Sequence, residues 1–539
     1  MLRRRGSVNV PGMNAPTPTP WSEARTALDA WREDTRTNYY EADPLLDRVL
    51  RRHLEPEAYA AARPGLVDFG ALSAQVLDPL IRENNRDENL PRLRRFDDFG
   101  HRIDAVDFHP NYGEIGRHVY RTPVIRGYAE PGQERVQLAY AYLLAHHGEG
   151  GHLCPLACTA GLVKLLQHRG DDGLKARLLP GLLHDDRLAP EHLHGAQFLT
   201  EIQGGSDVGA NALRATRDGS DWRLDGEKWF CSVIDADLYL VTARPDGAAP
   251  GTAGLGAFVV PRLRPDGSLN GVHVRRLKYK LGTRSMASGE ADFVDCFAWA
   301  LGPTEGAFKA VVEVVLNTSR VYNAVAACGV MRRAELEATA YARHRTAFGR
   351  PIDQFVDVRR TLDGLRARRS LAVAGTFALI ALQDRIALGA ATAGERDVFR
   401  LVVNMNKYAT ACASTDQVRA AIEVLGGNGA IEEFSVLPRL LRDSIVVEAW
   451  EGTHNVLCAQ VLRDLHKFGL HRPFFAGLRT ASAALSSAPT SGEIEALSRE
   501  TEALLASDPD TQTLGMRAFV DRLVDLWQRV ALAEVEGGR

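Results

Sequence analysis

The sequence lacks several features that mark specialised classes of protein. Its 539 residues contain no apolar run near the roughly 18 residues of a membrane-spanning helix, so we predict no membrane contact. The seven cysteines are scattered, which is typical of reduced thiols in a cytoplasm and argues against a secreted disulfide framework. No apolar stretch follows the N-terminal arginines, so residues 1–20 are not a secretory signal, and we expect a disordered lead there.

An excess of one charge is also lacking. Lys and Arg number 65 against 68 Asp and Glu, a net charge of -3, which argues against a chain that mainly coats nucleic acid. The last part of the chain, residues 456–539, has 9 basic and 11 acidic residues. Four of the basic residues fall within residues 463–479, and acidic residues dominate beyond them.

Hydrophobic periodicity divides the chain into four parts after the lead. Residues 21–194 are mostly helical in pattern, with loops. Residues 195–301 show short strand patterns, residues 302–455 return to long helical patterns, and residues 456–539 form a helical extension. Long helices with short connections are typical of a bundle.

The strand-rich part has one distinctive segment, WRLDGEKWF at 222–230. Here Asp225-Gly226 is a favoured two-residue turn, which predicts a β-hairpin. Further strands are predicted at 238–245, 255–261, 272–277 and 289–295. Strands at this spacing, with no helices between them, indicate an antiparallel sandwich or barrel. The expected fold class is therefore α+β.

Four short segments carry residues suited to chemistry. FLTEIQGGSDVGAN (198–211) offers a hydroxyl and exposed backbone N–H groups, and EAWEGTHN (448–455) places Glu451 beside apolar neighbours that would raise its pKa. LGGNG (425–429) lacks the G-x-G-x-x-G pattern, and RHRTAFG (343–349) places two arginines at a helix end. Taken singly, each is better explained as a turn or a helix cap.

A fifth segment, HHGEGGHLCPLAC at 146–158, combines three histidines with Cys154 and Cys158. Its C-x₃-C spacing is not a standard zinc pattern. We therefore predict no metal site, and interpret these residues as buried thiols and loop histidines.

The order of the motifs is more specific than any one of them. LTEIQGGSDV, LDGEKWFCS, RLKYKLGTRSMASGEADF, YARHRTAFGRPI, EVLGGNG and AWEGTHN follow one another along the chain. In this order they resemble the acyl-CoA dehydrogenase family of flavoproteins over nearly the whole sequence. RFDDFGHRIDAVDFHP, HLCPLA and the long tail resemble the longer branch associated with the adaptive response to DNA alkylation. The resemblance implies an N-terminal helical domain, a central β-barrel or sandwich, a C-terminal helical bundle and an extra helical tail.

The resemblance also implies FAD as cofactor, and a role for individual residues. Glu451 would be the catalytic base, with Arg284 close to its carboxylate. The cofactor-binding residues would be Leu199, Thr200, Gly205, Ser206, Phe230, Ser232, Arg345, Phe348, Glu423, Gly427, Thr453 and Asn455. Arg345 would reach FAD across a subunit interface. Phe230, Ser232, Glu423 and Asn455 differ from the residues usual in the family.

The implied reaction is α,β-dehydrogenation of an acyl-CoA, with Glu451 removing the α-proton while hydride leaves to flavin N5. The implied partners are an acyl-CoA or related thioester, electron-transfer flavoprotein or oxygen as acceptor, and other subunits of a cytoplasmic homotetramer. Two alternatives remain. One is a DNA-associated flavoprotein of the alkylation response, which the acidic tail disfavours. The other is a flavin oxidase or monooxygenase of specialised metabolism.

Overall fold

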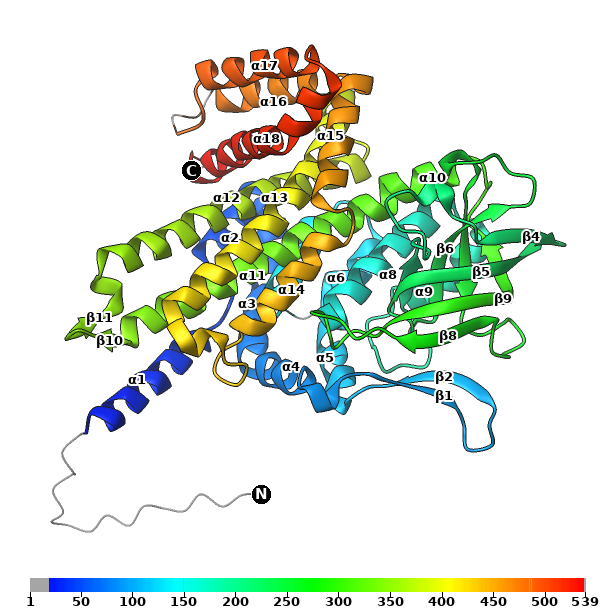
Figure 1. The fold of residues 1–539 in the computed structure, drawn as a ribbon, viewed down its shortest axis with the longest axis horizontal. Coiled ribbons are helices and arrows are strands. Elements are labelled where there is room, and N and C mark those ends of the chain that lie inside the picture. Colours follow the sequence, from blue (N-terminus) through cyan, green and yellow to red (C-terminus); the bar gives the residue numbers. More distant parts are fainter. Residues whose placement is uncertain (1–18, 149, 484, 486, 538–539) are drawn as a thin grey trace, which may run out of the picture.

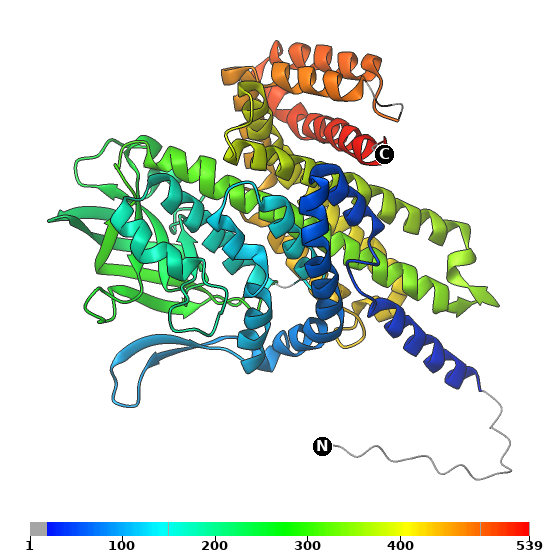
Figure 2. The same cartoon turned by 180° about the vertical axis from the view of Figure 1, so that it is seen from behind.

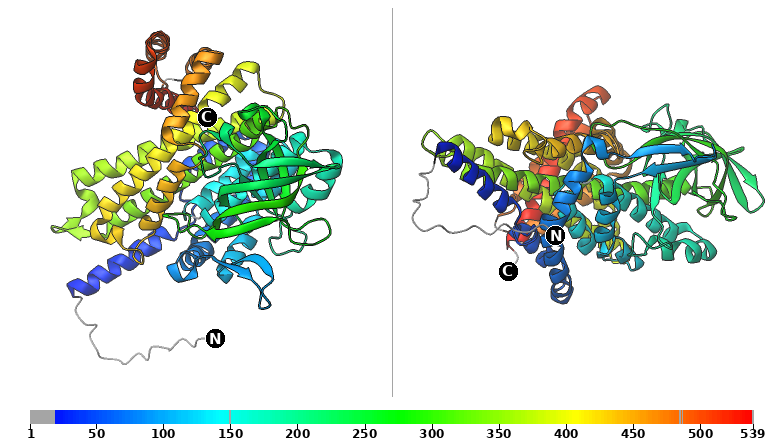
Figure 3. Two further views of the ribbon diagram at one scale, coloured as in Figure 1. Left: turned by 45° about the vertical axis from the view of Figure 1, so that its right-hand side comes forward. Right: turned by 90° about the horizontal axis from the view of Figure 1, so that it is seen from below.

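The computed structural model of the chain describes residues 19–148, 150–483, 485 and 487–537 (Figure 1). A β domain lies at one end of a long helical bundle, and a small group of C-terminal helices is stacked on the bundle's flank (Figure 3). The expected disordered lead falls mainly on residues 1–18, which lie outside the described residues. Its last residue, Pro20, already begins the first helix, and the Thr19 hydroxyl accepts from the Ser22 backbone N–H at 3.4 Å to cap it.

The N-terminal part is mostly helical, as predicted. Its helices are α1 (Pro20–Thr35), α2 (Pro44–His53), α3 (Pro56–Leu72), α4 (Asp78–Asn84), α5 (Pro110–Tyr120), α6 (Pro123–Arg126), α7 (Glu134–Ala145), α8 (Gly150–Arg169) and α9 (Asp172–Leu182). Seen from behind, α2 and α3 lie in front of the long bundle helices (Figure 2); α2 packs against α12, and α3 packs against α7.

One β-hairpin interrupts these helices, which the helical pattern did not predict. Its strands are β1 (Arg92–Phe96) and β2 (Arg102–Asp107). The Asp97 carboxylate closes the turn by accepting from the backbone N–H groups of Phe99 and His101 at 2.9 and 2.8 Å. Leu93 and Val106 pack against the β-domain core. The hairpin therefore joins the helical part to the β domain.

The β domain is formed by β3 (Gly195–Phe198), β4 (Arg214–Asp218), β5 (Asp221–Ser232), β6 (Leu238–Pro245), β7 (Gly256–Pro261), β8 (Val272–Leu277) and β9 (Ser288–Ala300). The strand order is β3-β6-β4-β5-β9-β7, and an additional β6–β7 pairing closes the sheet into a barrel-like ring. The predicted barrel is present, but not as a wholly antiparallel sheet, because β6 pairs in parallel with both β3 and β4.

The predicted hairpin at Asp225-Gly226 is wrong. β5 runs through both residues as one strand, and its register against β9 shifts between Leu224 and Gly226. Gly226 has φ +143°, and a Cβ there would lie 2.9 Å from the Leu213 side chain, so the glycine marks a β-bulge. The real turn lies between β4 and β5 and contains Gly219 at φ +60°.

The C-terminal part contains α10 (Ala307–Ala310), α11 (Asn317–His344), α12 (Val356–Ala387), α13 (Ala393–Leu425) and α14 (Leu437–Ala449), with the short strands β10 (Thr346–Ala347) and β11 (Arg350–Pro351). The extension consists of α15 (His454–Phe468), α16 (His471–Ser482), α17 (Ser491–Leu505) and α18 (Pro509–Gly537). By length and composition α12 would suffice to cross a membrane, yet 61% of its most apolar window is buried inside the protein, as in the core helix of a bundle.

Charged residues buried along α11 tie the N-terminal helices to the bundle. The Asp43 carboxylate is fully buried and accepts from Arg369 at 2.9 Å and from the Tyr142 hydroxyl at 2.6 Å, with Arg332 at 3.6 Å. Burial would raise the pKa of Asp43, but Arg369 and Arg332 outweigh it and hold that pKa below its ordinary value.

We expect Asp43→Ala to lower the free energy of unfolding by about 3–5 kcal/mol, because the buried Arg369 and Arg332 lose this carboxylate and retain Glu335 as their acidic partner. Urea unfolding measures the change. The control is Glu33→Ala, which removes an exposed 3.8 Å pair with Arg36 and should cost at most about 1 kcal/mol. Equal losses in the two variants would contradict this role of the buried charges.

Candidate active site

Glu451 lies in the short connection between α14 and α15. Its φ of +56° is uncommon for a residue with a side chain, and Gly452 follows at +107°. Two cations in the bundle donate to carbonyls of this connection. Arg320 Nε donates to the Glu451 oxygen at 3.2 Å, and Lys407 Nζ donates to the oxygens of Glu448 and Gly452 at 3.1 and 3.0 Å. These contacts hold the strained backbone in place.

The Glu451 side chain is turned toward the β domain. Its Oε1 accepts from Gln197 Nε2 at 3.2 Å, and Gln197 also donates to the Ser319 hydroxyl at 2.9 Å. Oε2 is buried and has no hydrogen-bond partner among the described residues. Burial raises the pKa of Glu451, while the charges of Arg320 and Lys407 act in the opposite direction. The arrangement suits a carboxylate that accepts a proton.

Sequence reasoning missed Gln197, Arg320 and Lys407. Lys407 is fully buried, and burial lowers its pKa to about 8, so it remains mostly charged at neutral pH. A lysine inside the apolar run of α13 was the available signal, because charged residues are almost never fully buried without a partner. Arg320 and Gln197 gave no comparable signal.

Leu199 and Thr200 follow β3 directly, and their carbonyls are tied to neighbouring segments. Asn211 and Lys228 donate to the Leu199 oxygen at 2.6 and 3.1 Å, and the Trp229 N–H donates to the Thr200 oxygen at 2.9 Å. The start of the predicted flavin loop is therefore fixed on β5, the strand that carries Phe230 and Ser232.

The rest of this loop is open to solvent. Gly205 and Ser206 are exposed, and a Cβ on Gly205 would lie 2.4 Å from the Thr200 hydroxyl, so only glycine fits there without a shift. The Phe230 side chain is 56% exposed, and the Lys278 ammonium lies 4.8 Å from its ring centroid. Val233, just after Ser232, has φ +58° and is a true backbone outlier.

Glu201 is a second carboxylate near the start of the flavin loop, but its surroundings do not suit a catalytic base. It forms a buried ion pair with Lys228 at 2.8 Å and accepts from the Ala212 N–H at 2.6 Å. Burial would raise the pKa of Glu201, but Lys228 and these hydrogen bonds lower it. Glu201 thus stabilises the loop as a permanent anion.

Arg345, Glu423 and Gly427 come together at a second place. They line one cavity of about 330 Å³ together with Tyr341, Ile352, Val424, Leu425, Gly426 and Asn428. A Cβ on Gly427 would meet no atom within 4 Å, so its backbone can be approached closely. Phe348 lies between β10 and β11 with φ +50° and is 96% exposed.

The two groups of predicted cofactor residues do not meet within one chain. The β10–β11 end of the bundle and the β domain lie at opposite ends of the molecule (Figure 1). One group lies around β3 and β5 of the β domain, and the other lies at the β10–β11 end. A single FAD that contacts both groups would need two copies of the chain.

Thr453 and Asn455 lie at the start of α15. Thr453 is the N-cap residue, is exposed and makes no side-chain capping hydrogen bond, and Asn455 is also exposed. The N–H groups of this first turn have no partner within the helix, which is the arrangement that accepts phosphate oxygens.

The contacts of Arg284 differ from those implied by the resemblance. Its guanidinium pairs with Asp87 at 2.8 Å and contacts the Tyr279 hydroxyl at 3.3 Å. The cations whose charges act on Glu451 are Arg320 and Lys407. A contact between Arg284 and Glu451 therefore stays a prediction.

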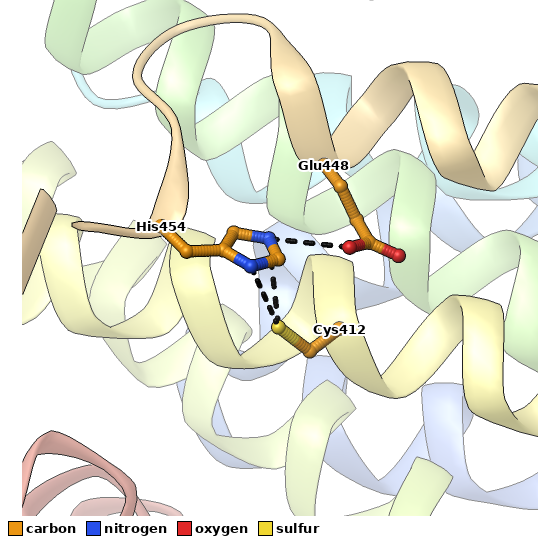
Figure 4. A group of neighbouring side chains, drawn as sticks. All are labelled: Cys412, Glu448 and His454. Atoms are coloured by element: carbon orange, nitrogen blue, oxygen red, sulfur yellow. Dashed lines mark hydrogen bonds and ion pairs between the residues drawn. The ribbon is translucent and has the colours of Figure 1, made fainter. Parts of the chain in front are cut away.

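Next to the Glu451 connection, Cys412, Glu448 and His454 form a cluster with ligand atoms within 4.8 Å of one another (Figure 4). Arg517 donates to His454 Nδ1 at 3.0 Å, which leaves the ring proton on Nε2, facing Glu448 at 3.4 Å. A metal ion at Nε2 would have to displace that proton. These residues are thus satisfied by one another without a metal.

A cavity of about 830 Å³ lies between α12, α13 and α18 and contains none of the predicted site residues. Its lining mixes arginines and carboxylates, including Arg360, Arg368, Asp416, Arg517 and Asp521. Size alone does not identify the active site in this protein, because the catalytic candidates lie elsewhere.

Comparison with known proteins identifies three regions of the chain. Residues 32–186 match the N-terminal domain of the adaptive response protein AidB, residues 196–296 the acyl-CoA dehydrogenase middle domain and residues 308–466 the acyl-CoA dehydrogenase C-terminal domain. The chain is 36% identical to the putative acyl-CoA dehydrogenase AidB of Escherichia coli, over 70% of each chain. It is 33% identical to acyl-CoA dehydrogenase family member 11 of Caenorhabditis elegans, over 83% of this chain and 73% of the relative.

Solved structures agree. The Caenorhabditis elegans ACDH-11 structure in complex with C11-CoA superposes with a TM-score of 0.85 at 26% identity, covering 99% of this chain and 91% of the other. The apo form of Bd2924 superposes with a TM-score of 0.86 at 29% identity, covering 93% of this chain and 98% of the other. The glutamate with its buried Oε2, the loop after β3 and these matches agree: the chain belongs to the acyl-CoA dehydrogenase family, in its AidB-like branch.

Proposed function

We propose that the protein oxidises the Cα–Cβ bond of an acyl-CoA with FAD as cofactor, and that Glu451 is its catalytic base. The observation that carries this is the Glu451 carboxyl, whose buried Oε2 has no partner among the described residues while Oε1 is held by Gln197. The complex of the related ACDH-11 with C11-CoA supports an acyl thioester as substrate class.

The residues of this chain fit FAD. The exposed Phe230 face and the fixed Leu199–Thr200 backbone offer a surface for a planar ring. The unpartnered N–H groups at the start of α15 and the exposed Arg345 beside its cavity suit a pyrophosphate and a nucleotide. When bound, FAD supplies the acceptor for the two electrons of the reaction.

The protein's own part in the reaction is to remove and hold one proton. Oε2 of Glu451 accepts the α-proton, and Gln197 keeps the carboxylate oriented through Oε1. The raised pKa makes Glu451 a stronger base than an exposed glutamate. Arg320 and Lys407 limit that rise, which favours the ionised carboxyl that the reaction needs.

Assembly follows from the same geometry. Because Arg345 and Glu423 lie far from the β domain, we propose that each FAD is shared by two subunits of a homotetramer.

The electron acceptor is either electron-transfer flavoprotein or oxygen. Reoxidation of the reduced protein in air would identify oxygen as the acceptor. The seven cysteines are all free, which supports a cytoplasmic location.

Three of the four basic residues within residues 463–479 lie beside carboxylates, which supports a role without DNA binding. Arg463 pairs with Asp464 at 2.9 Å, and Arg479 pairs with Glu495 at 2.5 Å. Arg472 lies 4.0 Å from Glu502. Phosphate binding depends on clustered cations that are free of such partners. We therefore propose a metabolic role in preference to a DNA-binding one.

We expect Glu451→Gln to bind FAD normally while flavin reduction by acyl-CoA slows about 10²–10⁴-fold, because the shape is kept and the base is lost. Anaerobic stopped-flow absorbance with a panel of acyl-CoA chain lengths measures this. Glu448→Gln, three residues earlier, is the matched control and should stay near the wild-type rate. An unchanged rate in Glu451→Gln would remove Glu451 from the mechanism.

The pH dependence of that rate should report the raised pKa of Glu451. The rate rises with pH as the carboxyl ionises, over a range above that of an ordinary glutamate. Lys407→Met removes a nearby positive charge, so the rise should move to higher pH. Lys309→Met, at an exposed position on α10, should leave the profile unchanged. A profile that does not move in Lys407→Met would show that this charge does not act on the base.

Arg345→Ala should weaken FAD binding about tenfold or more, because charge-assisted contacts to the cofactor are lost. Subunit association should weaken with it, since cofactor and assembly stabilise each other by mass action. Flavin absorbance after size-exclusion chromatography with light scattering measures both. Arg343→Ala, at an exposed site two residues earlier, is the control. A monomer with full FAD content would refute the shared site.

A further inference from the structure

Strand β3 carries residues on which the proposed site depends, yet it is short. Gln197, which holds Glu451, lies within β3, and Leu199 and Thr200 of the predicted flavin loop follow the strand directly. Among the described strands, β3 forms a ladder with β6 alone, over four parallel residue pairs. So short a parallel ladder supplies few hydrogen bonds. Contacts just outside the ladder must therefore help to fix β3.

His194 and Asp237 supply such contacts, because they lie immediately before β3 and β6. One oxygen of the Asp237 carboxylate, Oδ2, accepts from the backbone N–H of His194 at 2.9 Å and from His194 Nδ1 at 2.7 Å. In return, the N–H groups of Asp237 and Leu238 donate to the His194 oxygen at 3.2 and 3.3 Å. These contacts continue the pairing beyond the end of the ladder and fix the register in which Gly195 faces Leu238.

A second carboxylate faces the other side of the buried His194 ring. Asp235 Oδ2 lies 3.5 Å from His194 Nε2. A neutral imidazole has one N–H, so one of its ring nitrogens would turn a lone pair toward a carboxylate. The imidazolium instead presents an N–H to each carboxylate. The geometry therefore favours His194 in its protonated form.

The charges around His194 favour the same form on balance. Burial would lower the pKa of His194, but Asp235 and Asp237 outweigh it and raise that pKa, while the charge of Arg187 opposes them. Burial lowers the pKa of His192 to about 4, so this neighbour is neutral. The other titratable or charged side chains that face this group are Tyr120, His184, Tyr239 and Arg262.

We propose that His194, as an imidazolium between Asp235 and Asp237, is a positioning residue for the active site. It fixes the start of β3, and β3 in turn sets the position of Gln197 and of the flavin loop that follows. The consequences for FAD and for Glu451 rest on the proposed function. The ion pairs and their effect on folding do not.

Loss of the His194 proton should loosen β3. A group whose pKa is raised in the folded protein adds stability that is fully present below its ordinary pKa, here 6.5, and is lost as the pH rises through the folded value. FAD binding should weaken over the same range, because the strand before the flavin loop is held less firmly. The rate of flavin reduction instead rises with pH as Glu451 ionises. Cofactor binding and proton removal therefore report on different groups.

The first experiment measures urea unfolding of the full-length protein at about pH 6 and about pH 9, on either side of the ordinary histidine pKa. We expect the urea midpoint of His194→Gln to lie well below that of the wild type at the lower pH and to approach it at the higher pH. His168→Gln, the same substitution at an exposed histidine of α8, should match the wild type at both. An equal loss at both pH values would show that His194 acts without its proton and would overturn the proposal.

The second experiment measures release of FAD from the holoenzyme by flavin fluorescence over the same pH range. We expect the dissociation constant to rise several-fold with pH in the wild type and to be high throughout in His194→Gln. Asp237→Asn keeps an oxygen that accepts from His194 and removes the negative charge, so the rise should move to lower pH. Because Lys280 and Lys407 also have pKa values of about 8, the variants are compared with one another at each pH.

The outcomes separate this proposal from the proposed function. Dissociation constants that follow one pH profile in the wild type, His194→Gln and Asp237→Asn would overturn the link between His194 and the cofactor site. A protein that binds no FAD would refute the proposed function and with it the cofactor role of His194. The urea experiment would then still decide whether the His194 proton stabilises the fold.

Discussion

The burial of cations along and beside α11 is the constraint on which the rest of the molecule depends. Arg332 and Arg333 fix N-terminal acids such as Asp43 and Asp78 against the bundle. Nearer its start, Arg320 reaches the connection that carries Glu451. Buried charges are costly unless they are paired, so each must find its partner in the folded state. One helix therefore aligns the N-terminal helices, the bundle and the active-site backbone together.

The same cations set a compromise in the basicity of Glu451. A fully desolvated glutamate without compensation would stay protonated at neutral pH and could not act as a base. Strong pairing, as in the Lys228–Glu201 pair, would make it permanently ionised and a weak base. Arg320 and Lys407 instead donate to the backbone carbonyls around Glu451 and act on its carboxyl only through their charge. The basicity of Glu451 thus lies between these two limits.

Local patterns in the sequence predicted much of the fold. The helical spacing of α12 and the strand patterns of β6 to β8 predicted real elements, because burial on one face leaves a period in the residues. The Asp225-Gly226 pair led to a wrong hairpin prediction. The sequence alone does not distinguish a glycine at a β-bulge from a glycine in a hairpin turn. The β1–β2 hairpin was missed, because its packing partner is the distant β domain.

The candidate site was predictable where its residues lie in glycine-rich loops, and not where it depends on tertiary contacts. Motif order made Thr200, Arg345 and Glu451 candidates, whereas Gln197, Arg320 and Lys407 lie inside ordinary strand and helix patterns. No local sequence pattern shows to which carbonyl a buried lysine will donate. The supporting residues were therefore the part of the site that only the structure could supply.

The distance between the two groups of cofactor residues has a physical consequence for the whole protein. Residues at the β10–β11 end and residues of the β domain cannot act on one cofactor within one chain. If one FAD bridges two subunits, the free energy of cofactor binding adds to that of association, and neither step is complete alone. The exposed Phe230 and Phe348 would then be surfaces covered only in the assembly. Their exposure in the single chain fits the proposal that two chains complete the site.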